Sequence, residues 1–484
     1  MKAWFADRDH QILSGIVLLA FILRVWGLNA PLWYDEILTI ETHLRLPWDE
    51  MMQTYSMNHH YLFSLQAKLM TMLFGEAAWS VRLPAMLFGC GSIIAIWYLA
   101  RDIAGVRIAH LTALLLAVSF HHIWFSQNAR GYTELAFWST LGMIFFLKGM
   151  KHPTVRTWLA YSLCLALAVA THLTGFFFFA VQGLIWLVVA LATVRTRGLL
   201  HDSIKLPALA YTLGGVLMLA FYAPVLTGVA DVVSSVGETS ASDVMSEYQS
   251  PLWSVMEAVR TLLGSMGPLV GIVAVAVIGL SLLGAIRLTS SNPWFGPIVG
   301  LHIVLTMVLL ILLGMRIWPR FFFVDIGFLM LLIVIGVKWI CDLVPRYLQA
   351  ISAPALLGMA AAAMVALSAG LAIRNYTAPK QDLAGAVAYI EANATPNDNV
   401  YAVGVASKLF NGFYGQDWST IETSNSFKIS MVQPGTAYYV IAFPARYFRA
   451  IPEMEEMTEA GQLTLVKRLP GTLGDGRVLI FKKG

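Results

Sequence analysis

The sequence predicts a polytopic α-helical membrane protein, with about eleven transmembrane helices and a small C-terminal α/β domain outside the membrane. Of its 484 residues, 58% are hydrophobic and 12% are charged, whereas an ordinary soluble domain has roughly 25% charged residues. Apolar runs long enough to cross a bilayer recur along most of the chain, but residues 376–484 lack them. This composition excludes a soluble globular enzyme.

Each expected transmembrane helix corresponds to one apolar run. The first run, 12–28, follows a short polar head and carries Arg24 near its far end. A secretory signal peptide is the alternative, but the length of the run and this arginine favour a retained first helix. The other runs lie at 83–99, 108–125, 132–147, 158–173, 176–194, 206–226, 262–286, 294–313, 321–340 and 351–373.

The distribution of basic residues predicts the orientation of these helices. Cytoplasmic loops of membrane proteins are enriched in Lys and Arg, and an odd number of crossings places the two termini on opposite sides. With a cytoplasmic N-terminus, the inner loops hold Arg101, Arg107, Lys148, Lys151, Arg156, Arg195, Arg197, Lys205, Arg287, Lys338 and Arg346. Residues 1–375 then form a transmembrane domain with an outer interfacial loop at 29–82, and residues 376–484 form the outer domain.

Both outer segments contain recognisable elements. Within the loop, 36–46 and 61–74 mix apolar and polar residues at helical spacing, which is typical of short interfacial helices. In the C-terminal domain, 382–392 has a helical pattern. Four later runs, 400–405, 437–443, 463–469 and 477–482, have the pattern of strands. A small α/β domain follows from this order.

Cysteine and basic residues exclude two further classes. Cys90, Cys164 and Cys341 are far apart in apolar stretches, without the spacing of a zinc site or a disulfide framework. The net charge of +4 comes from dispersed residues, so nucleic acid is not an expected partner.

Ionisable residues near the outer ends of the helices are candidates for function, because such groups are costly at membrane depth. Asp35 and Glu36 follow the first helix between aromatic residues. Asp35 is either a catalytic carboxylate or an N-cap of the following helix. His59 and His60 open the second interfacial segment; they are either exposed loop residues or ligands, and a metal site shared with the acidic pair is possible.

Arginines form the second group of candidates. Arg130 ends the polar run Ser126-Gln127-Asn128-Ala129 before Gly131 and Tyr132, and it either contacts lipid headgroups or binds a ligand. Arg316 and Arg320 flank Pro319, which suits the first turn of a helix, where free N–H groups favour an anion such as phosphate.

Three weaker signals complete the set. His172 lies at the outer end of its helix, where it is either a core residue or part of a pocket. Glu134 and Asp325 are expected to neutralise Arg130 and Arg320, and His110 and His302 are assigned to packing.

Together these groups suit the transfer of a sugar from a lipid phosphate. The phosphate leaves as an anion, so arginines can stabilise it without a general acid. One carboxylate is still needed to accept the proton of the attacking hydroxyl. One base and a cationic clamp predict direct displacement with inversion, because a retaining enzyme needs a second carboxylate as nucleophile.

The order of these motifs resembles the C-type membrane glycosyltransferases. They are a Tyr-Asp-Glu loop after the first helix, a His-containing interfacial segment, Ser-Gln-Asn-Ala-Arg-Gly-Tyr, Thr-His, and Pro-Arg-Phe. More closely, the chain is similar to the bacterial branch related to dolichyl-phosphate-mannose protein mannosyltransferases and the lipid A aminoarabinose transferase. The resemblance spans the whole chain in architecture and roughly the first 180 residues in motif.

The resemblance implies roles for individual residues. Asp35 matches the general base with Glu36 beside it, and Arg130, Arg320 and Arg316 match positions that hold the donor phosphate. His59, His60, Tyr132 and His172 would line the substrate pocket. Relatives often have His-Pro-Pro where this chain has His59, His60 and Tyr61.

It also implies a polyprenyl-phosphate sugar donor, a lipid, glycan or protein acceptor, and a location in the bacterial cytoplasmic membrane. Many enzymes of this branch work without a metal, whereas oligosaccharyltransferases of the same broad fold bind a divalent ion.

Two other functions remain open from the sequence. A transporter or flippase of lipid-linked glycans would also face a phosphate with cations, but would carry polar groups along the full depth of several helices. A non-catalytic scaffold of envelope assembly would leave Asp35 and Arg320 without a purpose. The sugar and the acceptor are not identifiable from the sequence.

Overall fold

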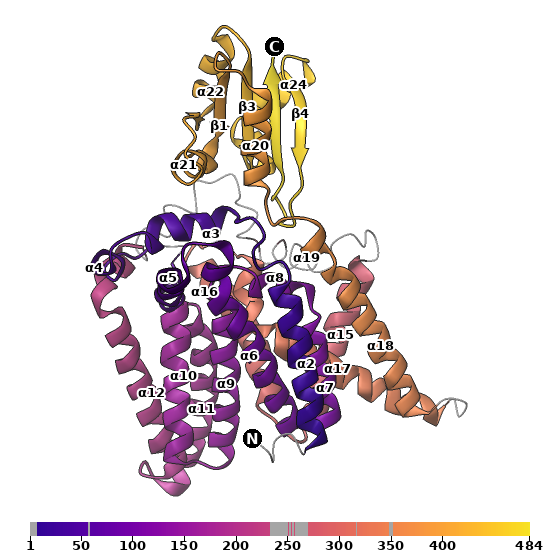
Figure 1. Cartoon of the computed structure of the whole chain (residues 1–484). Coiled ribbons are helices and arrows are strands. Elements are labelled where there is room, and N and C mark those ends of the chain that lie inside the picture. Colours follow the sequence, from indigo (N-terminus) through magenta and orange to yellow (C-terminus); the bar gives the residue numbers. More distant parts are fainter. Residues whose placement is uncertain are drawn as a thin grey trace.

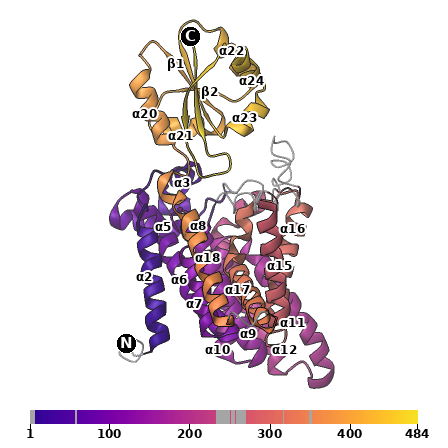
Figure 2. The ribbon, with the colours of Figure 1, turned by 90° about the vertical axis from the view of Figure 1, so that its right-hand side faces the viewer.

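In the computed structural model a bundle of helices carries a sheet domain at one end, and the N-terminus lies at the other (Figure 1). The structure describes residues 7–56, 59–232, 270–315, 317–347 and 352–484, together with Ser250, Trp253 and Met256. The view turned by 90° shows the sheet domain standing above the same end of the bundle (Figure 2). The sheet domain therefore meets the bundle at the end opposite the N-terminus.

The helices of the bundle follow the expected apolar runs. In chain order they are α2 (Arg8–Val25), α6 (Ala78–Ala104), α7 (Val106–Ala117), α8 (Phe120–Ser126), α9 (Tyr132–Lys151), α10 (Val155–Thr171), α11 (Gly175–Arg197), α12 (Asp202–Tyr222), α15 (Val270–Leu288), α16 (Phe295–Leu312), α17 (Ile326–Leu343) and α18 (Ala353–Ala372). Of the expected run 262–286, residues 262–269 lie outside the described residues.

The described helices support the expected multi-pass architecture but not the full count of eleven crossings. Among the described residues, seven helices are long and apolar enough to cross a membrane, and the bent pair α7 and α8 makes an eighth if it counts as one span. α2, α9 and α10 belong to the same bundle but do not meet this measure; α10, for example, has 17 residues. About seven or eight spans are therefore established.

The bend between α7 and α8 is braced by a buried arginine from α2. The helices meet at 61°, and Arg24 donates hydrogen bonds to the carbonyl oxygens of Ala117 (3.0 Å) and Leu116 (3.4 Å) at the end of α7. A helix end leaves its last carbonyls without helical partners, and a cation is favourable there. Arg24 also donates to Ser126 Oγ (3.1 Å), so it fixes where the polar run after α8 begins.

Short helices cover the end of the bundle that carries the sheet domain (Figure 1). They are α3 (Tyr34–Thr39), the π-helical turn η1 (Ile40–Leu44), α4 (Trp48–Met51) and α5 (Tyr61–Phe74). The second expected interfacial helix, 61–74, is confirmed, whereas the first is divided into α3 and η1. The loop 29–82 therefore forms a helical layer between the bundle and the sheet domain.

The sheet domain contains a five-stranded mixed sheet in the order β2-β1-β3-β5-β4. Its strands are β1 (Asn399–Val403), β2 (Ser419–Ile421), β3 (Ala437–Ala442), β4 (Thr464–Leu469) and β5 (Val478–Lys483). Strands β1, β2 and β3 are parallel, and β5 runs antiparallel to β3 and β4. The four expected strands are confirmed; β2 was missed because it has only three residues.

Helices pack beside this sheet and complete the expected α/β domain. They are α20 (Leu383–Asn393), α21 (Ser407–Gly412), α22 (Ser424–Val432), α23 (Pro444–Ala450) and α24 (Glu453–Glu459). All six residues of β3 are buried, as expected of a central strand covered on both faces. The Asp382 side chain caps α20 by accepting from the Gly385 N–H (2.9 Å).

One apolar cluster joins the interfacial layer to the sheet domain. It unites Ile37 and Ile40 of the loop with Leu383 and Phe410 of the sheet domain. The shared core means that the sheet domain rests directly on the helix that carries the acidic pair. A division of the chain after residue 375 remains a proposal.

Candidate active site

The acidic pair lies in the first turn of α3, and its two carboxylates have different surroundings. α3 begins at Tyr34, and Glu36 Oε2 accepts a hydrogen bond from the backbone N–H of Trp33 at the N-cap (3.3 Å). A carboxylate three residues after the N-cap commonly reaches back in this way. The alternative that Asp35 caps the helix is therefore wrong, because Trp33 occupies that position and Glu36 accepts its N–H.

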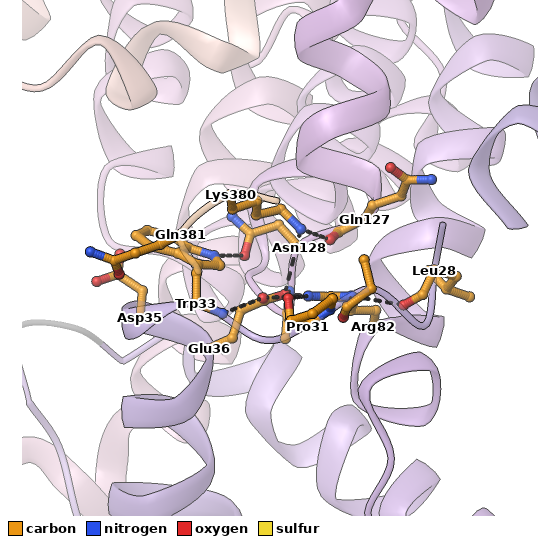
Figure 3. A network of polar contacts seen from close by, with 12 residues as sticks. Leu28, Pro31, Trp33, Asp35, Glu36, Arg82, Gln127, Asn128, Lys380 and Gln381 are labelled. Carbon is orange, nitrogen blue, oxygen red and sulfur yellow. Dashed lines mark hydrogen bonds and ion pairs between the residues drawn. The ribbon is translucent and has the colours of Figure 1, made fainter. Parts of the chain in front are cut away.

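Glu36 forms a bidentate ion pair with Arg82, and both side chains are fully buried. Arg82 Nε lies 2.7 Å from Glu36 Oε1, and Arg82 Nη2 lies 2.6 Å from Oε2. The guanidinium also donates to the carbonyl oxygens of Leu28 (2.8 Å), Ala30 (2.7 Å) and Pro31 (3.1 Å) (Figure 3). The start of α6 is thereby tied to the whole turn between α2 and α3.

The polar run after α8 supports this pair from the other side. The backbone N–H of Ala129 donates to Glu36 Oε1 (2.8 Å), and Asn128 Oδ1 accepts from Trp33 Nε1 (3.0 Å). Gln127 Nε2 donates to the carbonyl oxygen of Arg24 (3.0 Å) at the end of α2. Gln127, Asn128 and Ala129 therefore contact the end of α2, the Trp33 indole and the Glu36 carboxylate, and Arg130 follows directly from this fixed segment.

Asp35 pairs with Arg320, which comes from a segment 285 residues away. Arg320 lies in the 3₁₀ turn η5 (Pro319–Asp325) that precedes α17, where Pro319 occupies the first turn as expected. Its Nη1 atom is 3.0 Å from Asp35 Oδ2, and its side chain is 30% exposed, whereas that of Asp35 is 13% exposed. The expected base and the expected phosphate ligand thus meet where the Arg320 side chain is partly exposed and the Asp35 side chain is nearly buried.

Asp325 and Glu134 have other partners than the arginines expected for them. Asp325 Oδ1 is 2.9 Å from Nδ1 of His302 inside the bundle, so His302 has a polar contact besides its packing. Glu134 Oε1 accepts hydrogen bonds from Gln66 (2.7 Å) and Trp138 (3.3 Å). The neutralisation of Arg320 is therefore assigned to Asp35, which already belongs to the outer site.

His60, Tyr132 and His172 form an aromatic group beside the two arginines. The His60 ring lies 4.7 Å from Tyr132 and 4.5 Å from His172. Burial, together with the positive charges of Arg130 and Arg320, holds the pKa of His60 well below its ordinary value. Both ring nitrogens are buried and have no hydrogen-bond partner among the described residues. A neutral imidazole in this state suits a polar, uncharged ligand group.

A second pair of buried histidines, His43 and His59, lies next to this aromatic group. His59 stacks on His43 with 3.7 Å between the ring centroids, and His43 Nε2 lies 3.2 Å from Ser56 Oγ. Burial and the charge of Arg130 lower the pKa of His43 to about 4. His59 is therefore buried in a group with its neighbours and is not an exposed loop residue.

Metal binding receives no support from the arrangement of these side chains. In the part of the chain that the structure describes, no three His, Cys, Asp or Glu side chains are grouped as metal ligands. The Asp35 carboxylate contacts Arg320, and the His60 ring is surrounded by cations and aromatic rings. Arg316 lies outside the described residues, so its expected role at the phosphate stays a prediction.

Three members of the site were not foreseen. In the sequence Arg82 marks the end of the interfacial loop, and its place directly before the apolar run at 83–99 is the one signal of a buried partner. His43 lies within an ordinary amphipathic stretch. Lys380 lies 4.0 Å from Glu36, but it is 344 residues away in the sequence, and no local pattern indicates this contact.

Comparison with known proteins agrees with this geometry. Residues 58–227 match the family model of dolichyl-phosphate-mannose-protein mannosyltransferases. Over these residues the chain is similar to this glycosyltransferase family. The expected resemblance and the expected enzyme class are thereby confirmed. No curated protein sequence matches the chain.

Solved structures of the same fold extend over almost the whole chain. ArnT from Cupriavidus metallidurans in the apo state is similar with a TM-score of 0.54 and 16% identity, covering 98% of this chain and 97% of that chain. ArnT bound to undecaprenyl phosphate has a TM-score of 0.51 with the same identity and coverage. The oligosaccharyltransferase AglB from Archaeoglobus fulgidus, in complex with an inhibitory peptide and a dolichol-phosphate, has a TM-score of 0.51 and 14% identity, covering 92% and 71%.

Removal of the Arg82 side chain is expected to destabilise the protein strongly. The Arg82→Ala substitution leaves Glu36 buried without its partner, which costs roughly 3–5 kcal/mol. The matched control is Arg45→Ala, because Arg45 forms exposed ion pairs with Glu41 and Glu76, and exposed pairs contribute about 1 kcal/mol or less. Denaturant unfolding in detergent measures both; equal losses would contradict a central role for the buried pair.

The same ion pair predicts a dependence of stability on acid pH. Burial alone would raise the pKa of Glu36, but the charge of Arg82 and of Lys380 and the hydrogen bonds to the carboxylate lower it below 4.5. Since the folded-state pKa is lowered, the stabilisation is complete above pH 4.5 and is lost as the pH falls through the folded-state value. Unfolding free energies between pH 6 and pH 3 should fall less steeply for Glu36→Gln than for the wild type.

Proposed function

We propose that the chain is an inverting glycosyltransferase that moves a sugar from a polyprenyl-phosphate donor to a hydroxyl acceptor. The observation that carries the proposal is the contact between Asp35 and Arg320, which joins a nearly buried carboxylate and a partly exposed cation from distant segments. The bound lipid phosphates named in the ArnT and AglB structures support a donor of this class. The acceptor is an envelope glycan, a lipid or a protein.

In the proposed reaction Asp35 accepts the proton of the acceptor hydroxyl. The hydroxyl oxygen forms a bond to the anomeric carbon as the bond from that carbon to the phosphate oxygen breaks. The electron pair of the broken bond stays on the lipid phosphate, so no general acid is required. A single displacement inverts the anomeric configuration. Glu36 is engaged with Arg82, so we assign it to positioning and leave Asp35 as the base.

Arg320 and Arg130 are proposed to hold the phosphate. A guanidinium has five N–H donors in a planar fork, so Arg320 can contact Asp35 on one side and a phosphate oxygen on another. Arg130 lies beside the Tyr132 ring, with 6.0 Å between the guanidinium carbon and the ring centroid. Arg316 is proposed as a third cation.

The sugar is proposed to occupy the aromatic group of His60, Tyr132 and His172, with His59 beside it. Hydroxyl groups both donate and accept hydrogen bonds, which suits the neutral imidazole nitrogens of His60. Aromatic rings at 4.5–4.7 Å from this imidazole provide apolar faces for a sugar ring. A divalent metal is not needed for this mechanism.

We further propose that this end of the bundle faces the outside of a bacterial cytoplasmic membrane. The N-terminus lies at the opposite end of the bundle (Figure 1), and alternation of the helices places the lysine-rich and arginine-rich connections there, as in cytoplasmic loops. Eleven crossings, with α2, α9 and α10 among them, and an outer domain at 376–484 are part of this proposal.

The Asp35→Asn substitution tests the proposed base. An amide cannot accept the proton, so sugar transfer should fall by roughly 10²- to 10⁴-fold, with folding unchanged. The control is Glu41→Gln, which changes a partly exposed carboxylate of the same loop. Transfer from a polyprenyl-phosphate sugar in detergent is the measurement. Undiminished transfer by Asp35→Asn would refute the assignment. Movement of the donor across vesicles without any transfer would favour a flippase.

The Arg320→Met substitution tests the proposed phosphate contact. Loss of a charge-assisted hydrogen bond costs roughly 1.5–3 kcal/mol, which corresponds to about a 10- to 100-fold lower kcat/KM for the donor. Arg101→Met is the control, because Arg101 contacts Trp97, Tyr98 and Asp102 of α6. Initial rates at varied donor concentration distinguish the two variants, and an unchanged donor kcat/KM in Arg320→Met contradicts the contact.

A further inference from the structure

The connection between the bundle and the sheet domain is fixed against both parts. It follows the short helix α19 (Arg374–Thr377). The carbonyl oxygens of Pro379 and Lys380 accept the Thr472 N–H of the sheet domain at 3.0 and 3.1 Å. Thr472 Oγ1 in turn accepts from Trp124 Nε1 of α8 at 3.1 Å. Through these contacts the connection is held against both the sheet domain and α8.

Lys380 extends from this connection into the polar network below it (Figure 3). Its side chain is 10% exposed, and its Nζ atom lies 4.0 Å from Glu36 Oε1. Nζ also donates to the carbonyl oxygen of Gln127, and it lies 5.5 Å from the centroid of the Trp124 ring. A buried ammonium group is costly unless it is paired and hydrogen-bonded. Glu36 of α3 supplies the opposite charge, and the Gln127 carbonyl accepts the hydrogen bond.

Gln381 contacts the other side of the acidic pair. Its Oε1 atom accepts from the backbone N–H of Tyr34 at 3.4 Å, and the Tyr34 ring packs edge-on against Phe443 of the sheet domain at 5.3 Å. Consecutive residues of the connection therefore contact the residues on both sides of Asp35, namely Tyr34 and Glu36.

The orientation of Asp35 depends on such contacts. α3 has six residues, and a helix of this length is not stable by itself in water. The direction of its first turn is therefore set by the groups that hold Glu36, Trp33 and Tyr34. Displacement of a catalytic group by about 1 Å can lower a rate by roughly 100-fold.

We propose that Lys380 is a positioning residue, which aligns the Asp35 carboxylate by holding Glu36 and Gln127 and thereby couples the docking of the sheet domain to sugar transfer. The inference rests on the proposed function for its catalytic consequence. Its structural consequence, the ordering of α3, is independent of the reaction.

The charge of Lys380 provides a specific signature. Burial and the positive charge of Arg82 lower the pKa of Lys380 to about 7, although Glu36 opposes this shift. Asp382, two residues further along the chain, accepts from the Gly385 N–H and caps α20. As the pH rises through about 7, Lys380 loses the charge that attracts Glu36, so kcat should decline. In Lys380→Arg the cation is retained at higher pH, because an arginine is not deprotonated in proteins.

The experiment compares Lys380→Met and Lys380→Arg with Lys408→Met, an exposed lysine of the same domain. Kinetics of transfer are measured from pH 6 to pH 9, and hydrogen exchange is followed in the peptide that contains residues 33–39. We expect Lys380→Met to lower kcat by roughly 10- to 100-fold with the donor KM within about twofold of wild type, and to accelerate exchange in that peptide. Lys380→Arg should restore kcat and move the decline to higher pH.

Several results would overturn the proposal. They are an unchanged kcat in Lys380→Met, a rise in donor KM equal to the whole loss, the same pH profile in Lys380→Arg as in the wild type, or unchanged exchange at α3. Gln381→Ala gives a second test without a buried charge, in case Lys380→Met fails to fold; unaltered exchange there also counts against the proposal. If the wild type transfers no sugar, the proposed function fails, while the exchange measurement still decides the contact with α3.

Discussion

The buried ion pair between Glu36 and Arg82 is the interaction on which the outer end of the molecule depends. Arg82 uses its guanidinium to hold Glu36 and the carbonyls of the turn before α3. Glu36 uses its carboxylate to hold Arg82, the N-cap of α3 and the Ala129 N–H. Two desolvated charges are stable together only when their remaining hydrogen-bonding capacity is satisfied, and these backbone groups satisfy it. Three chain segments, at residues 28–36, at Arg82 and at Ala129, therefore have to assemble for the pair to exist.

The two adjacent carboxylates have different partners and different exposure. The Glu36 side chain is fully buried and holds the surrounding segments together, whereas the Asp35 side chain is 13% exposed and meets Arg320. In the proposed reaction a rigid neighbour is an advantage for Asp35, because a general base has to keep its geometry while its own charge changes. The proposal therefore assigns positioning to Glu36 and proton transfer to Asp35.

The cations of the site follow from the same principle. Arg130 emerges from a run whose preceding side chains hold backbone carbonyls and the indole of Trp33. Arg320 emerges from a turn whose first residue is Pro319. The local backbone of each arginine is therefore restrained, and their positive charge together with burial lowers the pKa of the nearby His60 imidazole. Cations and a neutral imidazole thus lie side by side, which suits the phosphate and the sugar of the proposed donor.

The amino-acid sequence by itself determined the membrane class, the helical segments, the interfacial helix at 61–74, and four of the five strands. It also located Asp35, Arg130, Arg320, His60 and His172 at one end of the bundle. Such features are readable because apolar length and periodicity are local properties of the chain. Only the tertiary structure decided that Glu36 pairs with Arg82, that Asp325 pairs with His302, and that Lys380 reaches the acidic loop. Those pairings form because distant segments pack and bury the paired charges in the same place. The sequence pattern of either segment alone does not show which partner its charge will meet.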